Sequence, residues 1–345
     1  MSVPSLSVII PNYNHGRFLP QCLDAIFRQE TAPGEVLIID DASTDDSLEV
    51  IERYRKLHPT VRLLRNETNR GAVQTITRGL METDSEYVYF AAADDWVLPG
   101  LFSRSLELLG QYPQAGFCSA LSLQVTEQNR NPHEFLTPVV CSRPGFISPQ
   151  RARELLYRHG TWFLGNALVL RRQAVMEMGG FRPELHSFCD GFLYHLLALK
   201  YGACFIPEPL AVWRRLDSGF SGATVANIDR METIRERVTG LITGPYHALF
   251  GDRLIQRWLS RWRFTTLNAQ LRSGGYEAGA LARSWPQAKA VDRRVLDLAK
   301  GSPVGRRAGT LYLFARLRPG DLVPIAARRL RWALRRLVRK PEPGR

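Results

Sequence analysis

Two adjacent aspartates, Asp94 and Asp95, follow an uncharged segment that begins at Tyr87 and precede Pro99-Gly100. Its aromatic, β-branched and small residues predict a buried strand. The carboxyl ends of strands are where open α/β sheets bind ligands. Neighbouring carboxylates repel each other and raise each other's pKa unless a cation accompanies them. Because Mg²⁺ and Mn²⁺ prefer oxygen ligands, the pair predicts a metal that carries a substrate phosphate. Capping of a helix that begins near Leu101 is the alternative.

Strand and helix signals alternate four times in the first 100 residues, which predicts a parallel sheet covered by helices. The expected strands are 6–10, 35–39, 61–64 and the segment from 87, and the expected helices are 18–26, one capped by Ser43 and Thr44, and 72–81. Right-handed crossovers place the strand ends at one edge. We therefore expect the pair Asp40/Asp41, which follows the second strand, to face the same crevice as Asp94/Asp95.

The rest of the chain carries weaker signals. Helices are expected at 101–109, from Ser148-Pro149 and at 192–201, strands within 115–125 and 204–215, and an irregular loop at 129–149. Beyond residue 227 only helical signals remain. We expect a catalytic domain over residues 1–220, a helical extension over 221–300 and a basic tail over 301–345.

The formal net charge of +13 is concentrated in the tail, where residues 301–345 hold twelve Lys and Arg against two Asp and Glu. Segment 323–340 has helical periodicity, with apolar Ile325, Leu330, Leu334 and Leu337 on one face and Arg328, Arg331, Arg335 and Arg339 elsewhere. Such a basic amphipathic helix suits the surface of an anionic membrane. Nucleic-acid binding and packing against the body are the alternatives, and we expect no nucleic acid because the body carries no motif for it.

Five scattered cysteines without a CxxC pair favour a reducing cytosol over a disulfide framework or a zinc site. The sequence shows no signal peptide and no apolar run of about 18 residues. We therefore expect a cytoplasmic protein that the tail directs to the inner face of the cytoplasmic membrane.

Four motifs occur in order: SVIIPNYN at 7–14, IIDDASTDDS at 38–47, NRGA at 69–72 and AADDW at 92–96. Together they resemble family 2 glycosyltransferases of the GT-A fold, over about residues 5–220. The resemblance implies an α/β fold with a mostly parallel sheet and a helical C-terminal region. It also implies inverting transfer of a sugar from a UDP- or GDP-type donor, with Mg²⁺ or Mn²⁺, to a cell-envelope glycan, lipid-linked or polysaccharide acceptor.

The resemblance assigns several residues to the donor. Pro11 and Tyr13 match the loop that walls the nucleobase, with Asn14 beside them, and Asp41 matches the acid that accepts the base N–H, with Asp40 as its neighbour. A surface turn is the alternative for Asn14, and helix capping for the two acids.

Phosphate contacts are implied at a predicted helix start, where backbone N–H groups and a cation meet an anion. The residues concerned are Asn69, Arg70 and Gly71, and a solvated Arg70 is the alternative. In the family's acidic motif the first position is Ala92 here, so Asp95 is implied as the metal ligand and Asp94 lies by the ribose and phosphates.

Asp190 is the implied general base, because it follows Gly179-Gly180-Phe181 at a helix start; helix capping is its alternative. Arg214 matches an aromatic-Arg pair that binds pyrophosphate. Trp162 is a candidate platform for the acceptor sugar, with a core position as the alternative.

Two rival functions remain. A metal-dependent nucleotidyltransferase would also use strand-end acids, but it would show a glycine-rich phosphate loop, and PNYNHG is poor in glycine. A nucleotide-sugar-binding module without transfer activity fits the missing first acid at Ala92. Assays with a panel of nucleotide-sugars distinguish all three.

Overall fold

The computed structural model describes residues 5–126, 133–134, 137–216, 227–273, 276, 281 and 284–321. The chain forms two units, residues 1–154 with 161–220 and residues 155–160 with 221–345. The tail segment 323–340, predicted as a basic amphipathic helix, lies outside the described residues.

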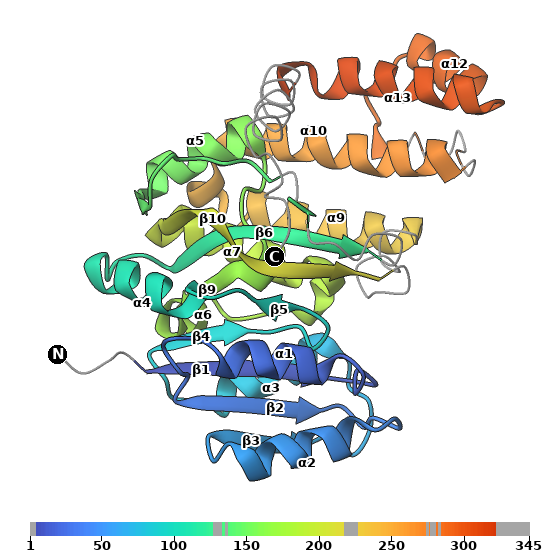
Figure 1. Ribbon diagram of the computed structural model, residues 1–345. Coiled ribbons are helices and arrows are strands. Elements are labelled where there is room, and N and C mark those ends of the chain that lie inside the picture. Colours follow the sequence, from blue (N-terminus) through green and yellow to red (C-terminus); the bar gives the residue numbers. More distant parts are fainter. Residues whose placement is uncertain are drawn as a thin grey trace, which may run out of the picture. The chain divides into compact units, whose positions relative to one another are not determined.

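The first unit begins with the predicted parallel arrangement (Figure 1). Strands β1 (Leu6–Asn12), β2 (Glu35–Asp40), β3 (Val61–Arg65) and β4 (Tyr87–Phe90) lie side by side in the order β3-β2-β1-β4. Helices α1 (Leu19–Phe27), α2 (Ser47–Leu57) and α3 (Ala72–Met81) connect them. All three pairings are parallel, so the carboxyl ends of β1, β2 and β4 meet at one edge. The acid pairs that follow β2 and β4 therefore share that edge, as predicted.

The other half of the sheet is mixed. Strand β9 (Leu168–Arg171) lies antiparallel between β4 and β6 (Phe117–Thr126), and β10 (Ala203–Arg215) runs parallel to β6. The short β5 (Trp96–Val97) pairs antiparallel with β10 at the edge. Segment 129–149 is less irregular than predicted, since β7 (His133–Glu134) pairs with β6 and β8 (Gly145–Ile147) pairs with β10.

The remaining elements of this unit are short connections and helices. They are α4 (Leu101–Gln111), α5 (Pro149–His159), η1 (Gly165–Ala167), α6 (Arg172–Glu177), η2 (Pro183–Phe188) and α7 (Cys189–Tyr201). Ser148 starts α5 as predicted, because its hydroxyl accepts the backbone N–H of Arg151. The prediction that Ser43 and Thr44 cap α2 is wrong: α2 begins at Ser47 with Asp46 at its N-cap.

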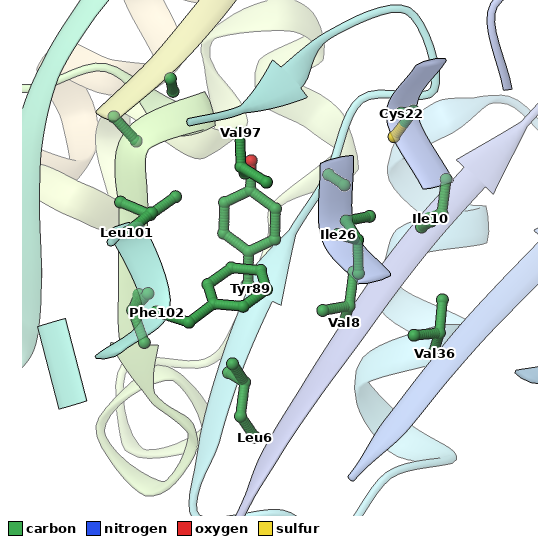
Figure 2. Packing of buried hydrophobic residues seen from close by; sticks show 14 of the residues in the cluster. Leu6, Val8, Ile10, Cys22, Ile26, Val36, Tyr89, Val97, Leu101 and Phe102 are labelled. Carbon is green, nitrogen blue, oxygen red and sulfur yellow. The ribbon is translucent and has the colours of Figure 1, made fainter. Parts of the chain in front are cut away.

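The sheet is covered on both faces. On one face, apolar residues of β1, β2 and β4 pack against α1, α2 and α4, and Figure 2 shows Val8, Ile26, Tyr89 and Phe102 within this core. On the other face Gly79 of α3 lies directly over Ile9 and Ile39, where a Cβ atom would collide with both side chains. This packing fixes the position of each strand end.

The second unit is helical where it is described. It contains α9 (Ile228–Thr243), α10 (His247–Ser273), α12 (Ala290–Ala299), α13 (Pro303–Leu317) and η3 (Pro319–Asp321), around a core that includes Leu267, Leu271, Trp285, Leu296 and Leu313. Buried Asp321 pairs with Arg257, Arg261 and Arg318. Among the described helices, none combines the length and the apolar character needed to cross a membrane.

Candidate active site

The loop after β4 carries Asp94 and Asp95. Asp95 is 5% exposed, and its Oδ1 accepts the backbone N–H of Arg214 at 2.7 Å. Asp94 is partly exposed, and within the described part of the chain the hydrogen bond recorded for its carboxylate comes from its own backbone amide. Gly100 occupies the N-cap of α4 in a left-handed conformation, so neither acid caps that helix.

Both carboxylates carry charge that the protein leaves largely uncompensated. Burial raises the pKa of Asp95 well above its ordinary value, and the negative charge of Asp94 raises it further. Burial also raises the pKa of Asp94, against the opposing fields of His15 and Arg214. A cation beside the pair would remove this penalty, because it favours the charged form of both groups.

The donor set fits a small divalent cation that is shared with a ligand. No group of three or more His, Cys, Asp or Glu side chains gathers as a metal site among the described residues. Mg²⁺ is commonly held by one or two carboxylates together with substrate phosphates and water, so two acids are sufficient. The side chain of Ala92 is exposed, and its carbonyl oxygen accepts the Asp95 N–H at 3.1 Å, which fixes the turn.

Both carboxylates of the other acid pair, Asp40 and Asp41, are buried and accept hydrogen bonds from the protein. Asp40 is 0% exposed; its carboxylate accepts the Asn12 side-chain amide at 3.1 Å and the backbone N–H of Ser43 at 3.2 Å. The assignment of Asp40 to the donor is therefore corrected, because it has no surface to offer a ligand. It ties the end of β1 to the turn after β2.

Asp41 holds the loop that leads into α3. Its Oδ1 accepts the Asn66 side-chain amide at 2.7 Å and the backbone N–H of Arg70 at 2.9 Å, and its Oδ2 accepts the backbone N–H of Gly71 at 2.8 Å. A carboxylate offers about four lone-pair sites. One site on Oδ2 remains for a further donor, such as the N–H of a nucleobase.

The loop after β1 supplies an exposed aromatic face. The Tyr13 side chain is 45% exposed and Pro11 is partly exposed. Asn14 has a φ of 55°, and this strained conformation is fixed because its N–H donates to the Ser43 hydroxyl and its Oδ1 accepts the Thr44 N–H at 2.8 Å. Ser43 and Thr44, predicted as helix caps, thus hold the loop after β1 in place.

The predicted phosphate loop lies beside Asp41. Asn69 and Arg70 are exposed, and Gly71 has a φ of +87°, which favours glycine. The backbone N–H groups of Arg70 and Gly71 point at Asp41 rather than at solvent. These two N–H groups are therefore not available to a phosphate, whereas the side chains of Asn69 and Arg70 are exposed.

The Arg214 side chain already has hydrogen-bond partners within the protein. Its predicted contact with pyrophosphate would be made in addition to these bonds. Its Nε donates to the carbonyl of Asp94 at 2.9 Å and its Nη2 to Gln21 at 2.7 Å. The guanidinium lies 4.7 Å from the Phe18 ring centroid and 5.1 Å from that of Trp96. Arg214 therefore positions the acidic loop on β10.

Asp190 lies in the first turn of α7, whose N-cap is Phe188, so Asp190 is not the capping residue. It is partly exposed, and burial raises its pKa. Gly165 lies against it: a Cβ atom there would be 3.3 Å from the carboxylate oxygen Oδ2. The next residue, Asn166, hydrogen-bonds with Asp95 and lowers its pKa. One dipeptide thus adjoins both the candidate base and the candidate metal ligand.

Trp162 lies in the core and not at a binding surface. It is 0% exposed, with its ring centroid 5.0 Å from that of Phe163 and 5.7 Å from that of Phe205. The assignment of Trp162 as an acceptor platform is therefore corrected.

Two residues at the site were not predicted from the sequence. His15 lies close enough to Asp94 to lower its pKa, and Asn166 hydrogen-bonds with Asp95. His15 directly follows Asn14 in the PNYNHG segment, so the sequence could have indicated that it lies at the site. Asn166 lies in a mixed apolar stretch without a pattern, and only the pairing of β9 with β4 and β6 brings it to the site.

The fold and the acids at its strand ends define a glycosyltransferase with the nucleotide-sugar-binding GT-A fold. The family model "Glycosyl transferase family 2" matches residues 7–179, so the chain belongs to this family. The Mycobacterium tuberculosis protein MT1568 is 29% identical over 251 residues, which are 70% of this chain and 77% of that protein. The Escherichia coli glycosyltransferase YibD is 40% identical over 107 residues, 31% of each chain.

Solved structures of low sequence identity share the fold. Staphylococcus aureus TarS in complex with UDP-GlcNAc aligns with a TM-score of 0.61 at 16% identity, over 92% of this chain and 88% of that one. The mannosyltransferase PcManGT from Pyrobaculum calidifontis, in complex with GDP-Man and Mn²⁺, aligns with a TM-score of 0.56 at 20% identity, over 92% and 87%. Membership of a glycosyltransferase family decides against the nucleotidyltransferase alternative.

Proposed function

We propose that the chain is a metal-dependent inverting glycosyltransferase that takes its sugar from a UDP- or GDP-type donor. The observation that carries the proposal is the shared dipeptide: Gly165 adjoins Asp190, and Asn166 adjoins Asp95. An inverting displacement needs a base on one face of the sugar and a diphosphate held on the other. UDP-GlcNAc and GDP-Man with Mn²⁺, the ligands of the two structural neighbours, are the first donors to test.

The donor-binding roles follow from exposure and hydrogen bonding. Tyr13 offers its ring to the nucleobase, beside Pro11 and Asn14, and the free lone pair of Asp41 accepts a base N–H. The side chains of Asn69 and Arg70 face the diphosphate, with Gly71 shaping their loop.

Asp94 and Asp95 would hold Mg²⁺ or Mn²⁺. When bound, the ion neutralises charge on the diphosphate leaving group. Asp95 is the direct ligand in this proposal, because Arg214 and Asn166 fix its carboxylate, while the partly exposed Asp94 lies toward the ribose and phosphates.

In the proposed reaction the acceptor hydroxyl oxygen attacks the anomeric carbon as Asp190 takes its proton. The new C–O bond forms while the bond from the anomeric carbon to the phosphate oxygen breaks, and the electron pair leaves with the nucleoside diphosphate. Burial raises the pKa of Asp190, which makes its carboxylate a stronger base than an exposed aspartate. Gly165 leaves room for this carboxylate.

The acceptor we propose is a cell-envelope glycan, lipid-linked or polysaccharide intermediate. The basic composition of residues 301–345 supports a location at the inner face of the cytoplasmic membrane. In this proposal residues 1–220 carry catalysis, 221–300 extend the fold, and 301–345 contact the membrane.

A panel of UDP- and GDP-linked sugars tests the proposal, with nucleoside diphosphate release measured in Mn²⁺ and in EDTA. We expect release with at least one donor and strong suppression in EDTA. Nucleotide-sugar binding without release from any donor, in the presence of candidate glycan acceptors, would support the binding-module alternative.

A further inference from the structure

A groove of about 420 Å³ lies on the second unit, between the last turn of α10 and the first turns of α13. Arginine predominates in its lining, which comprises Arg272, Pro303, Arg306, Arg307, Thr310 and Leu311. Among the described residues, no carboxylate belongs to this lining. The groove therefore combines a mainly apolar lining with three arginine side chains.

The sequence builds this groove by bringing α13 unusually close to its neighbours. Gly309 faces α10 and α12, where a Cβ atom would be 2.6 Å from the Leu271 side chain and 2.7 Å from that of Ala299. Leu313, one turn further, is 0% exposed in the same core. Figure 1 shows α13 running beside α10, so Arg306 and Arg307 come to lie next to Arg272.

Several other arginines of this unit have acidic partners. Arg316 pairs with Asp292, and Arg257 and Arg261 pair with Asp321. Among the described residues no salt bridge or hydrogen bond to an acid is recorded for Arg272, Arg306 or Arg307.

The first turn of α13 contains no acidic residue, although helix starts favour negative charge. The positive potential of the groove is thus left without an anion from the described protein.

An exposed apolar stripe runs along α13 beside the groove. Val304 is 76% exposed and Leu311 is 72% exposed, and exposed Ala308 and Ala315 continue the same face at helical spacing. Since Gly309 and Leu313 occupy the buried face, α13 is apolar on two sides. Apolar side chains beside arginines match the boundary between lipid headgroups and acyl chains.

We propose that this face of α13 docks on an anionic phospholipid bilayer, with a lipid phosphate in the groove and Val304 and Leu311 in the headgroup region. Arg306 and Arg307 bind the phosphate oxygens from α13 and Arg272 does so from α10, since guanidinium groups suit phosphate. This site is distinct from the tail segment 323–340. The site rests on the membrane contact proposed for residues 301–345 and places that contact on α13. It needs no sugar transfer, so its failure would leave the proposed transfer reaction untouched.

Vesicle co-sedimentation of the full chain tests the contribution of the groove arginines to membrane binding. Phosphatidylcholine vesicles with and without 30% phosphatidylglycerol are compared for the parent, the double variant Arg306→Gln/Arg307→Gln, and the matched control Arg293→Gln/Arg294→Gln. The control removes the same charge from an exposed arginine pair on α12. We expect the groove variant to lose about 10- to 30-fold in partition coefficient, since each basic residue at such a surface contributes about 1 kcal/mol, and the control to lose clearly less. Equal losses would overturn the groove as a site.

A second pair of variants tests the contribution of the apolar stripe on α13 to membrane binding. Leu311→Asn should reduce partitioning about tenfold, whereas Leu57→Asn, at a 66% exposed leucine of the first unit, should leave it unchanged. Calorimetry with inorganic phosphate separates the sources of the anion: a parent protein that binds inorganic phosphate but does not sediment with phosphatidylglycerol vesicles would point to a soluble phosphate and overturn lipid docking. If Leu311→Asn instead dissociates an oligomer in sedimentation velocity and leaves vesicle binding intact, the face contacts a second copy and the proposal is wrong.

Discussion

Asp40/Asp41 and Asp94/Asp95 are both adjacent aspartate pairs that follow parallel strands of one sheet, yet their surroundings differ. The carboxylates of the first pair accept hydrogen bonds from Asn12 and Asn66 and from three backbone N–H groups. The second pair receives two backbone bonds and contributions from Asn166, His15 and Arg214, and burial still raises the pKa of both acids.

The comparison shows that position at a strand end does not determine what an acid does. A carboxylate that its own protein satisfies holds loops together, and Asp40 is the clearest case. A buried carboxylate whose charge the protein does not balance either takes up a proton or gains from a cation beside it. Asp190 adds a third situation, a partly exposed acid beside the same segment that contacts Asp95.

The largest effect is expected at this third acid. Asp190→Asn should lower kcat about 10²- to 10⁴-fold, because an amide cannot take the acceptor proton. Binding of nucleoside diphosphate with metal should be unchanged, since donor and metal binding are assigned to Asp41, Asp94 and Asp95 and not to Asp190. Steady-state kinetics and calorimetry measure the two quantities. Near-parental turnover would show that Asp190 only stabilises the start of α7.

The pH dependence of turnover tests the same residue in the parent protein. The deprotonated carboxylate is the active form, so kcat falls as the pH drops through the pKa of Asp190. Burial raises that pKa, and the acidic limb should therefore lie above the ordinary aspartate value of about 3.9. A pH–rate profile that stays flat to pH 4 would contradict this assignment.

Stability measurements separate the two acid pairs. Asp40→Ala leaves the Asn12 amide and the Ser43 N–H without their acceptor, and should reduce the free energy of unfolding by about 1–3 kcal/mol. The matched variant Asp94→Ala removes a charge that repels Asp95, and should leave the stability unchanged or higher in EDTA. Urea unfolding at pH 7 gives both values. A larger loss of stability in Asp94→Ala than in Asp40→Ala would contradict the distinction between the two acid pairs.

A smaller effect, a gain in metal affinity, is expected from a change at the first position of the acidic motif. Ala92 is exposed, so Ala92→Asp has room for a carboxylate beside the existing pair. It should tighten Mn²⁺ binding in the presence of nucleoside diphosphate several-fold, with little effect on thermal stability. Weaker binding would indicate that the site is built for two acids.

The sequence predicted the parallel half of the sheet because its strands and helices alternate with short connections, and helix 72–81 has the predicted bounds. That topology also predicted that the two acid pairs lie at the same edge of the sheet. The antiparallel insertion of β9 was not predicted, since Leu168–Arg171 is a short apolar run within a mixed segment.

Burial depends on tertiary packing and could not be read from local patterns. Asp40 and Asp41 are adjacent and chemically identical, yet Asp40 is 0% exposed and held by β1, while Asp41 holds the loop before α3. Trp162 resembled a binding platform because an aromatic residue near a predicted site is ambiguous until its neighbours are known. Asn166 lay outside every motif, and the sheet alone places it beside Asp95.

The central claim is that Asp94 and Asp95 bind a divalent cation together with a nucleoside diphosphate. Isothermal titration calorimetry of UDP and GDP, in Mn²⁺ and in EDTA, tests it directly on the parent and on Asp94→Asn/Asp95→Asn. We predict that Mn²⁺ tightens binding at least tenfold in the parent and that the double variant loses this enhancement while it binds the nucleotide as the parent does in EDTA. Equal affinity of the parent in Mn²⁺ and in EDTA, for both nucleotides, would contradict the claim.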